Sequence, residues 1–145
     1  MEISRILRVL ITILLAVSFI IVTFAAYQRD QEVESMVKLS DTTSSIATRL
    51  SIKDLAWIDE EGKENPYILD NDSANNLTYS STLGGENYAY RIQISYIKNE
   101  EKESLGPYGP EPPEEVMTGS LTVPTSLYYK GSIIPAKLKV TTWRT

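Results

Sequence analysis

The sequence contains no cysteine and no histidine. It therefore cannot form disulfide bonds, thiolate nucleophiles or Cys/His zinc sites, and it lacks the side chain that most often acts as a general base at neutral pH. A domain without disulfides must be stabilised by burial of its own core or by packing against neighbours. Basic residues are outnumbered by acidic ones, and the net charge of -5 argues against nucleic acid as a partner.

Sequence motifs of catalysis are also missing. The chain has no nucleophile elbow, phosphate-binding loop or dinucleotide fingerprint. Acidic residues gather at 59–61, 70–72 and 100–103, in expected turns without an apolar pocket that would raise a carboxyl pKa. The segment that starts at Asp70 has the first spacing of a calcium loop, but it lacks the glycine, and Ser81 stands where a bidentate glutamate is needed. We expect no catalytic residue, cofactor, metal or small-molecule substrate.

One long hydrophobic run is present near the N-terminus. Residues 9–26 carry no charge, and their only polar side chains are Thr12, Ser18 and Thr23. About 20 apolar residues span a bilayer as a helix, and small hydroxyls are tolerated there because they can bond to the preceding helical turn. We predict a membrane anchor over residues 6–26, with the lipid bilayer as its partner. The alternative is a secretory signal cleaved after Ala25, but the apolar core of a signal is usually shorter.

The charges that flank this run predict its orientation. Arg5 and Arg8 precede it, whereas the residues after it turn acidic from Asp30. The positive-inside bias then places the N-terminus in the cytoplasm and the rest of the chain outside, as a single-pass protein of the cell membrane. Asn71 and Asn76 begin two N-x-S/T sequons, so they are candidate glycosylation sites on an exported surface.

Helical periodicity continues beyond the anchor. We divide the chain into residues 1–27 (a cytoplasmic stub and transmembrane helix), 28–50 (an amphipathic outer helix) and 51–145 (an extracytoplasmic β domain). Apolar residues of the outer helix recur at helical spacing and form one stripe. This stripe packs on the chain's own sheet, or it also associates with other copies through Val33, Met36, Leu39, Ile46 and Leu50.

After Leu50 the period changes from helical to alternating. Residues 87–97 and 136–144 are the clearest strands, and Gly131 marks the turn of a C-terminal hairpin. Residues 98–115 are acidic and rich in proline, which predicts an exposed, partly extended loop. The expected fold is α+β, with one long helix packed on an antiparallel sheet of about four or five strands.

The layout resembles that of type IV pilin-like membrane proteins, and most closely that of uncharacterised pilin-like proteins of euryarchaeal genomes. The helix over residues 6–50 and the ending GSIIPAKLKVTTWR at residues 131–144 carry the resemblance. It implies a subunit whose apolar helices bundle in a filament, or a minor component of such an assembly. The chain departs from the family because no Gly or Ala precedes the apolar run at residues 3–6, and no glutamate lies between Ser4 and Gln31. An uncleaved, membrane-resident form fits these residues better.

Two functions follow as expectations. The first is a non-enzymatic pilin-like envelope protein that forms homo-oligomers, or binds other pilin-like subunits, through its N-terminal helix. The alternative is a monomeric membrane-tethered binding module that uses its tyrosine-rich sheet or its proline-rich loop. Tyr88, Tyr90 and Tyr96 share one strand face, and Tyr128 and Tyr129 lie in the terminal hairpin. Such residues are more often core and cross-strand pairs than a ligand platform.

Overall fold

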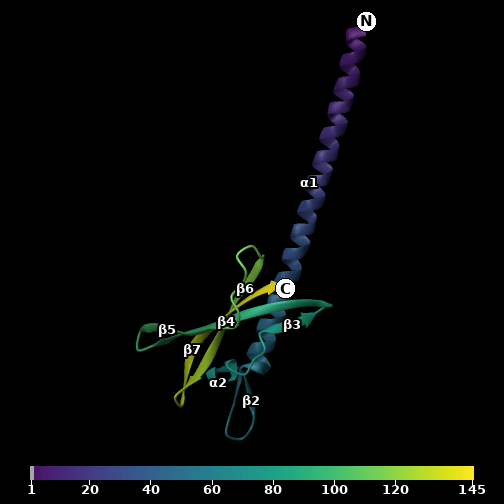
Figure 1. Cartoon of the computed structure of the whole chain (residues 1–145). Helices are drawn as coiled ribbons and strands as arrows, with labels where there is room; N and C mark the ends of the chain where they lie inside the picture. Colours follow the sequence, from purple (N-terminus) through teal and green to yellow (C-terminus); the bar gives the residue numbers. More distant parts are fainter. Residues whose placement is uncertain (1) are drawn as a thin grey trace. The chain divides into compact units, whose positions relative to one another are not determined.

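The computed structural model describes residues 2–145 and divides them between two compact units, one ending at Val37 and the other comprising Lys38–Thr145. Met1, which belongs to the predicted cytoplasmic stub, lies outside the described residues. In chain order the elements are α1 (Glu2–Arg49), the π-helical turn η1 (Leu50–Asp54), β1 (Ala56–Ile58), β2 (Glu64–Asp70), α2 (Asn71–Ala74), β3 (Ser80–Leu83), β4 (Glu86–Lys98), β5 (Glu101–Tyr108), β6 (Thr118–Tyr129) and β7 (Ser132–Arg144) (Figure 1).

A single long helix was predicted, and α1 confirms it. The helix extends from Glu2 to Arg49, although residues 41–45 have low helix propensity. Residues 2–37 of this helix are exposed along their whole length. The buried positions begin at Leu39, within the second unit. The unit boundary therefore falls inside the predicted outer helix, and the last turns of α1 belong to the β domain.

The α+β class is confirmed, but the sheet is larger than expected and is mixed. It has seven strands in the order β1-β2-β6-β7-β4-β3, and β5 also pairs with β4. All pairs are antiparallel except β2 and β6, which run parallel over residues 68–70 and 126–128. The expectation of a purely antiparallel sheet is wrong at this pair, because alternation along one strand does not encode the direction of its neighbour. A stacked pair of rings, Trp57 on Tyr128 with centroids 4.2 Å apart, spans the same region.

The proline-rich segment is only partly a loop. Glu101–Tyr108 forms the edge strand β5, so the prediction of an unpaired loop over residues 98–115 is wrong for these positions. Tyr108 pairs with Ile92, and Leu105 pairs with Ile94. The two residues between them on β5, Gly106 and Pro107, therefore form a bulge. A bulge on an edge strand tolerates a proline without an amide donor and a glycine with positive φ, here 93°. Leu105 and Tyr108 pack against the core, whereas most other residues of β5 are exposed.

Strand β6 continues through Pro124, although proline has no amide donor for a strand partner. Pro124 lies opposite Lys137 of β7, whereas β2 reaches only residues 126–128 of β6. At Pro124 the strand therefore has a partner on one side only, and a missing amide donor can be tolerated there. As a result, β6 and β7 pair over their whole length, from Thr118 opposite Trp143 to Tyr129 opposite Ser132.

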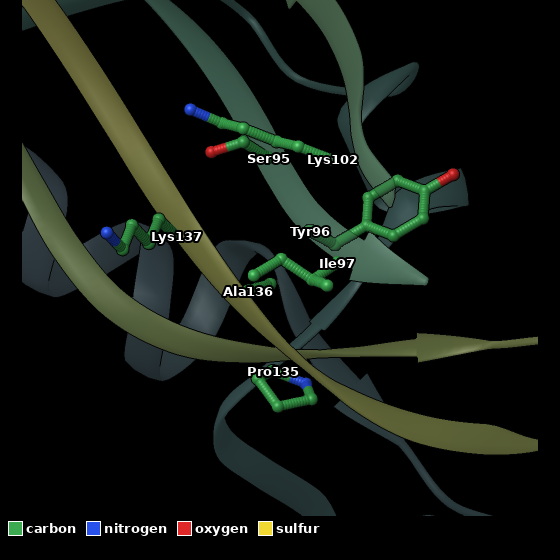
Figure 2. A pocket seen from close by; sticks show the side chains of 7 residues that line it. All are labelled: Ser95, Tyr96, Ile97, Lys102, Pro135, Ala136 and Lys137. Carbon is green, nitrogen blue, oxygen red and sulfur yellow. The ribbon is translucent and has the colours of Figure 1, made fainter. Parts of the chain in front are cut away.

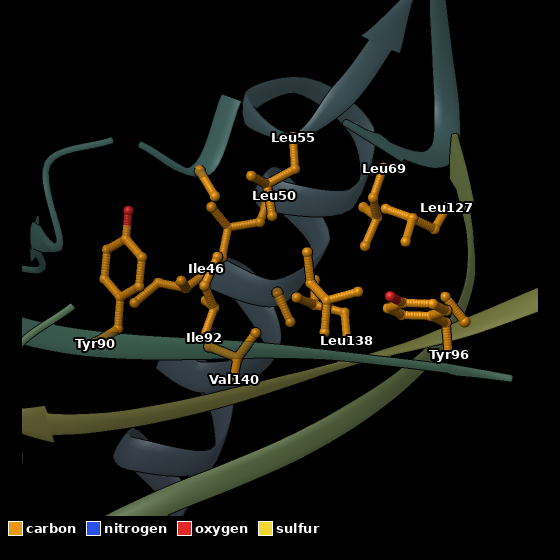
Figure 3. Close-up of a cluster of buried hydrophobic side chains, with 14 residues drawn as sticks. Ile46, Leu50, Leu55, Leu69, Tyr90, Ile92, Tyr96, Leu127, Leu138 and Val140 are labelled. Atoms are coloured by element: carbon orange, nitrogen blue, oxygen red, sulfur yellow. The ribbon is translucent and has the colours of Figure 1, made fainter. Parts of the chain in front are cut away.

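The hydrophobic core lies between the end of α1 and one face of the sheet. Figure 3 shows Ile46 and Leu50 of the helical region above Ile92 and Leu138 of the central strands. Each of these four side chains is at most 1 % exposed, and burial of such an aliphatic side chain contributes about 1.5–3 kcal/mol. Other members of the core are Ala47, Leu55, Leu69, Ala74, Tyr90, Ile94, Tyr96, Leu127, Ala136 and Val140.

The helix and the sheet approach each other closely at Gly119 of β6. A Cβ atom on Gly119 would lie 2.8 Å from Thr43 Oγ1 and 3.1 Å from Leu39 Cγ, so any larger residue would push the helix away. The hydroxyl of Thr43 donates to the carbonyl oxygen of Leu39 at 2.7 Å and is also hydrogen-bonded to the hydroxyl of Thr142. The hydroxyl of Thr43 is thus hydrogen-bonded although the residue is buried.

Candidate functional site

The apolar segment of α1 has the surface that a lipid environment requires. Its large aliphatic and aromatic side chains are all exposed between Ile6 and Phe24. Thr12, Ser18 and Thr23 donate to the carbonyl oxygens of Arg8, Leu14 and Phe19 at 2.8–2.9 Å, which confirms the predicted back-bonding. These bonds satisfy each hydroxyl within the helix itself. By length and composition the helix can cross a membrane.

The five predicted association residues divide into two groups. Leu39, Ile46 and Leu50 are buried in the core of the β domain, at 7 %, 1 % and 0 % exposure, so they are not available to another molecule. Val33 and Met36 are 53 % and 55 % exposed. Val37, which the sequence reasoning did not select, is equally exposed at 54 %. Val33, Met36 and Val37 lie at helical spacing, and we call them the exposed stripe.

The second candidate surface is the face of the sheet opposite the core. Side chains alternate between the two faces of a strand, so the residues next to the buried ones along each strand point away from the core. Cross-strand register places Lys139 opposite Gln93 and Thr122, and Lys137 opposite Ser95. On the edge strand, Lys102 lies opposite Ile97. We call this surface the outer face; its polar residues are Arg91, Gln93, Ser95, Lys102, Ser104, Ser120, Thr122, Lys137, Lys139 and Thr141.

The outer face is basic although the chain is acidic. Its cations are Arg91, Lys102, Lys137 and Lys139, and none of the four forms an ion pair within residues 2–145. The buried Nε of Arg91 also has no hydrogen-bond acceptor among the described residues. Positive charge that is not neutralised within the chain attracts anionic groups from outside. The alternating lysines of β7 were visible in the sequence, but the contributions of Arg91 and Lys102 depend on the register between strands.

Shallow hollows on this face merge into one another. Two of them share Ser95, Lys102 and Lys137, and the middle one, with a volume of about 370 Å³, shares Gln93 and Lys139 with a third. Figure 2 shows Lys102 extending beside Ser95, with Lys137 on the neighbouring strand. The result is a shallow groove across β5, β4, β7 and β6 that is open to solvent. Lysine, hydroxyl and amide side chains form most of its lining, and Glu103 contributes a carboxylate.

An acidic, proline-rich segment reaches one end of this groove. Pro107 and Pro112 line the third hollow together with Arg91, Lys139 and Thr141. Beyond Pro112 the chain carries Glu114 and Glu115, which are exposed, as is Glu111. These three glutamates form no ion pair within residues 2–145. We call residues 109–115 the acidic segment.

Several other acidic residues have local structural roles. Asp59 closes the turn between β1 and β2, because its Oδ1 accepts from the amide of Lys63 at 2.9 Å, and this bond lowers the pKa of Asp59. Glu103 accepts from the hydroxyl of Tyr96 at 2.6 Å, which raises the pKa of Tyr96 to about 12. Asp70 caps α2 by accepting from the amide of Asp72. In residues 2–145 no three Asp or Glu side chains are grouped so that they could hold a metal ion.

The tyrosine side chains mostly belong to the core. Tyr88, Tyr90 and Tyr96 are no more than 5 % exposed, so they offer no surface for a ligand. Tyr129 is partly buried and lies against Tyr96 at a centroid distance of 5.6 Å, with Lys98 and Lys130 over its ring. These contacts account for the ring within the fold.

The two sequons differ in accessibility. Asn76 is exposed in the turn after α2. Asn71 is half-buried, and its Oδ1 accepts from the hydroxyl of Tyr108 at 2.6 Å. A glycan fits the environment of Asn76 better, and glycosylation of either residue stays a prediction.

Comparison with known proteins gives no family for this chain. No protein-family model, curated protein or solved structure matches it.

Proposed function

We propose that this chain is a non-enzymatic, single-pass envelope protein that acts as a pilin-like subunit or minor component of a type IV pilus-like assembly. The observation that carries the proposal is the division of α1. One part of the helix has the length and surface of a membrane span, and another part forms one wall of the β domain's core. A helix that serves as both anchor and core element is the layout that the resemblance to archaeal pilin-like proteins implies.

The exposed stripe supports association between helices. A span over residues 6–26 takes up the apolar length that a bilayer requires, so Val33, Met36 and Val37 lie beyond it. These side chains are more than half exposed, and the buried positions of α1 begin at Leu39, within the second unit. Apolar residues at i, i+3 and i+4 are the anchors by which one helix packs on another. We infer that neighbouring copies, or other pilin-like subunits, cover the stripe.

Oxidative cross-linking tests this association, since the chain has no cysteine of its own. With Met36→Cys in native membranes, we expect oxidation to produce disulfide-linked dimers because the stripes of two copies face each other. Ser35→Cys is the matched control, because Ser35 lies on the opposite side of the helix from the stripe and is also exposed. Equal dimer yields at both positions, or none at Met36, would contradict the proposal.

The alternative function, a monomeric binding module, is favoured by one observation, the basic outer face. The buried tyrosines do not support it. A monomeric module predicts no cross-linking at Met36 and retention of an anionic ligand by the outer face. The Met36→Cys experiment therefore separates the two functions.

A further inference from the structure

We propose that the outer face of the sheet is the docking surface for the acidic segment, residues 109–115, of a second copy of this chain. The inference rests on the proposed assembly and names one of its contacts. It accounts for two features of residues 2–145 at once, a cluster of cations and a cluster of glutamates that form no ion pair within that part of the chain.

The two surfaces are complementary in hydrogen bonding as well as in charge. The groove offers ammonium, guanidinium and hydroxyl donors, which outnumber its carboxylate, Glu103. In the acidic segment Pro110, Pro112 and Pro113 have no amide donor, so the segment offers mainly carbonyl and carboxylate acceptors. A neutral or basic peptide would lack the charges, and an ordinary strand would bring its own donors. The acidic segment matches the groove on both counts.

The spacings of the charges are also compatible. Lys137 and Lys139 lie two residues apart on one strand, about 7 Å, and Lys102 lies two strands away from β7, about 10 Å. Glu114 and Glu115 lie in a turn in which the amide of Val116 donates to the carbonyl oxygen of Pro113, and the residues before this turn have no regular structure. At a rise of about 3.1 Å per residue between them, Glu111 and Glu114 lie about 9 Å apart. Carboxylates at this separation can reach two ammonium groups of the face together.

This contact would extend from copy to copy. Within one copy, Pro112 of the acidic segment lines one end of the outer face, but the glutamates of the segment form no ion pair among residues 2–145. A contact between the glutamates of one copy and the lysines of another is heterologous, so each copy that donates its segment still offers its own lysines to the next. Heterologous contacts form open rows unless their rotation closes a ring. The outer face would thus join the β domains, while the exposed stripe joins the helices.

Isotope-mixed cross-linking tests the contact directly. The full chain is prepared with ¹⁴N and with ¹⁵N, the two are co-reconstituted in lipid vesicles, and a zero-length carbodiimide joins carboxylates to lysines. We expect isopeptides of mixed isotope composition between the acidic segment and Lys102, Lys137 or Lys139. Their yield should fall as salt is raised, because exposed ion pairs are screened. Isopeptides of single isotope composition only would mean that the segment contacts its own face, and would overturn the proposal.

Charge reversal adds a second, independent test. One variant carries Lys137→Glu and Lys139→Glu, and the other carries Glu114→Lys and Glu115→Lys. Each alone should lose mixed-isotope cross-links about fivefold, whereas a mixture of the two should restore them, because each face then meets a segment of opposite charge. Circular dichroism verifies that both variants fold. Glu60→Lys with Glu61→Lys, on the turn between β1 and β2, is the matched control and should leave the yield unchanged.

The remaining outcomes have defined meanings. Loss without restoration in the mixture overturns the proposal. Binding of an anionic polymer is the other possible outcome, tested with added polygalacturonate. If wild-type vesicles retain this polymer, the variant with Lys137→Glu and Lys139→Glu does not, and no mixed-isotope products form, the proposal is overturned and the face binds an anionic polymer instead. If Met36→Cys still cross-links while the isopeptides are absent, the proposed function stands and this contact alone fails. If both are absent, the assembly itself fails.

Discussion

Replacement of Ile46 by alanine is expected to lower the free energy of unfolding of the β domain by about 2–5 kcal/mol. Ile46 is 1 % exposed and packs between the helix and the sheet beside Ile92 and Val140 (Figure 3). Truncation removes buried methyl groups and leaves a cavity that the surrounding strands can only partly close. Because stability of a small domain is about 5–15 kcal/mol, this loss is a large share of the total.

The measurement is denaturant unfolding of the full chain in detergent micelles, followed by tryptophan fluorescence. Both tryptophans, Trp57 and Trp143, belong to the sheet and report on its unfolding. Val37→Ala is the matched control, because Val37 is on the same helix but 54 % exposed, and we expect a change within about 0.5 kcal/mol. Similar losses for both variants would mean that the end of α1 does not form one wall of the core.

Replacement of Leu14 and Val17 by arginine is expected to release the protein from membranes. Both residues lie near the middle of the segment 6–26, and both side chains are exposed. An arginine at the centre of a span costs about 2.5–3.5 kcal/mol on insertion scales, so two of them outweigh the gain from the remaining apolar residues. The measurement is the fraction of protein that sediments with membranes after an alkaline carbonate wash.

The control for this prediction is Leu14→Ala with Val17→Ala, which shortens the same side chains without adding charge. This variant should stay in the membrane fraction. If the arginine variant also stays there, the segment does not lie across the hydrocarbon layer, and residues 6–26 have another environment.

The predictions that succeeded depend on local periodicity. The helical spacing of apolar residues continued past the membrane segment and predicted one long helix, α1. Alternation of apolar and polar residues predicted the long strands β4 and β7 and their buried faces. Gly131 correctly marked the turn between β6 and β7. Each of these signals lies within one element, where side-chain direction follows directly from the backbone repeat.

The predictions that failed depend on which elements become neighbours. Strand β5 contains Gly106 and Pro107, which are turn residues in isolation and become acceptable only because a bulge opposite β4 accommodates them. The parallel pairing of β2 with β6 has no local signal. In the same way, no pattern in the helix predicted that Leu39 is buried whereas Met36 is exposed.

The candidate surfaces show the same limit. Lys137 and Lys139 are visible as alternating charges in the sequence, and so is the run of glutamates near Pro112 and Pro113. That Arg91 and Lys102 join the two lysines on one face follows only from the pairing of β4 with β5 and β7. The polar side of an amphipathic strand was therefore predictable, whereas the shape and charge of the outer face were not.

The most direct test of the account is the labelling of single cysteines by a maleimide that cannot cross membranes. In separate variants, Glu60→Cys lies in the exposed turn between β1 and β2, and Glu2→Cys lies before the apolar segment. An anchored protein with an outward β domain predicts labelling of Glu60→Cys in intact cells, and labelling of Glu2→Cys on the membrane-bound protein only after permeabilisation. Labelling of Glu2→Cys in intact cells, protection of Glu60→Cys, or a mature chain that lacks residue 2 and the anchor would contradict the account.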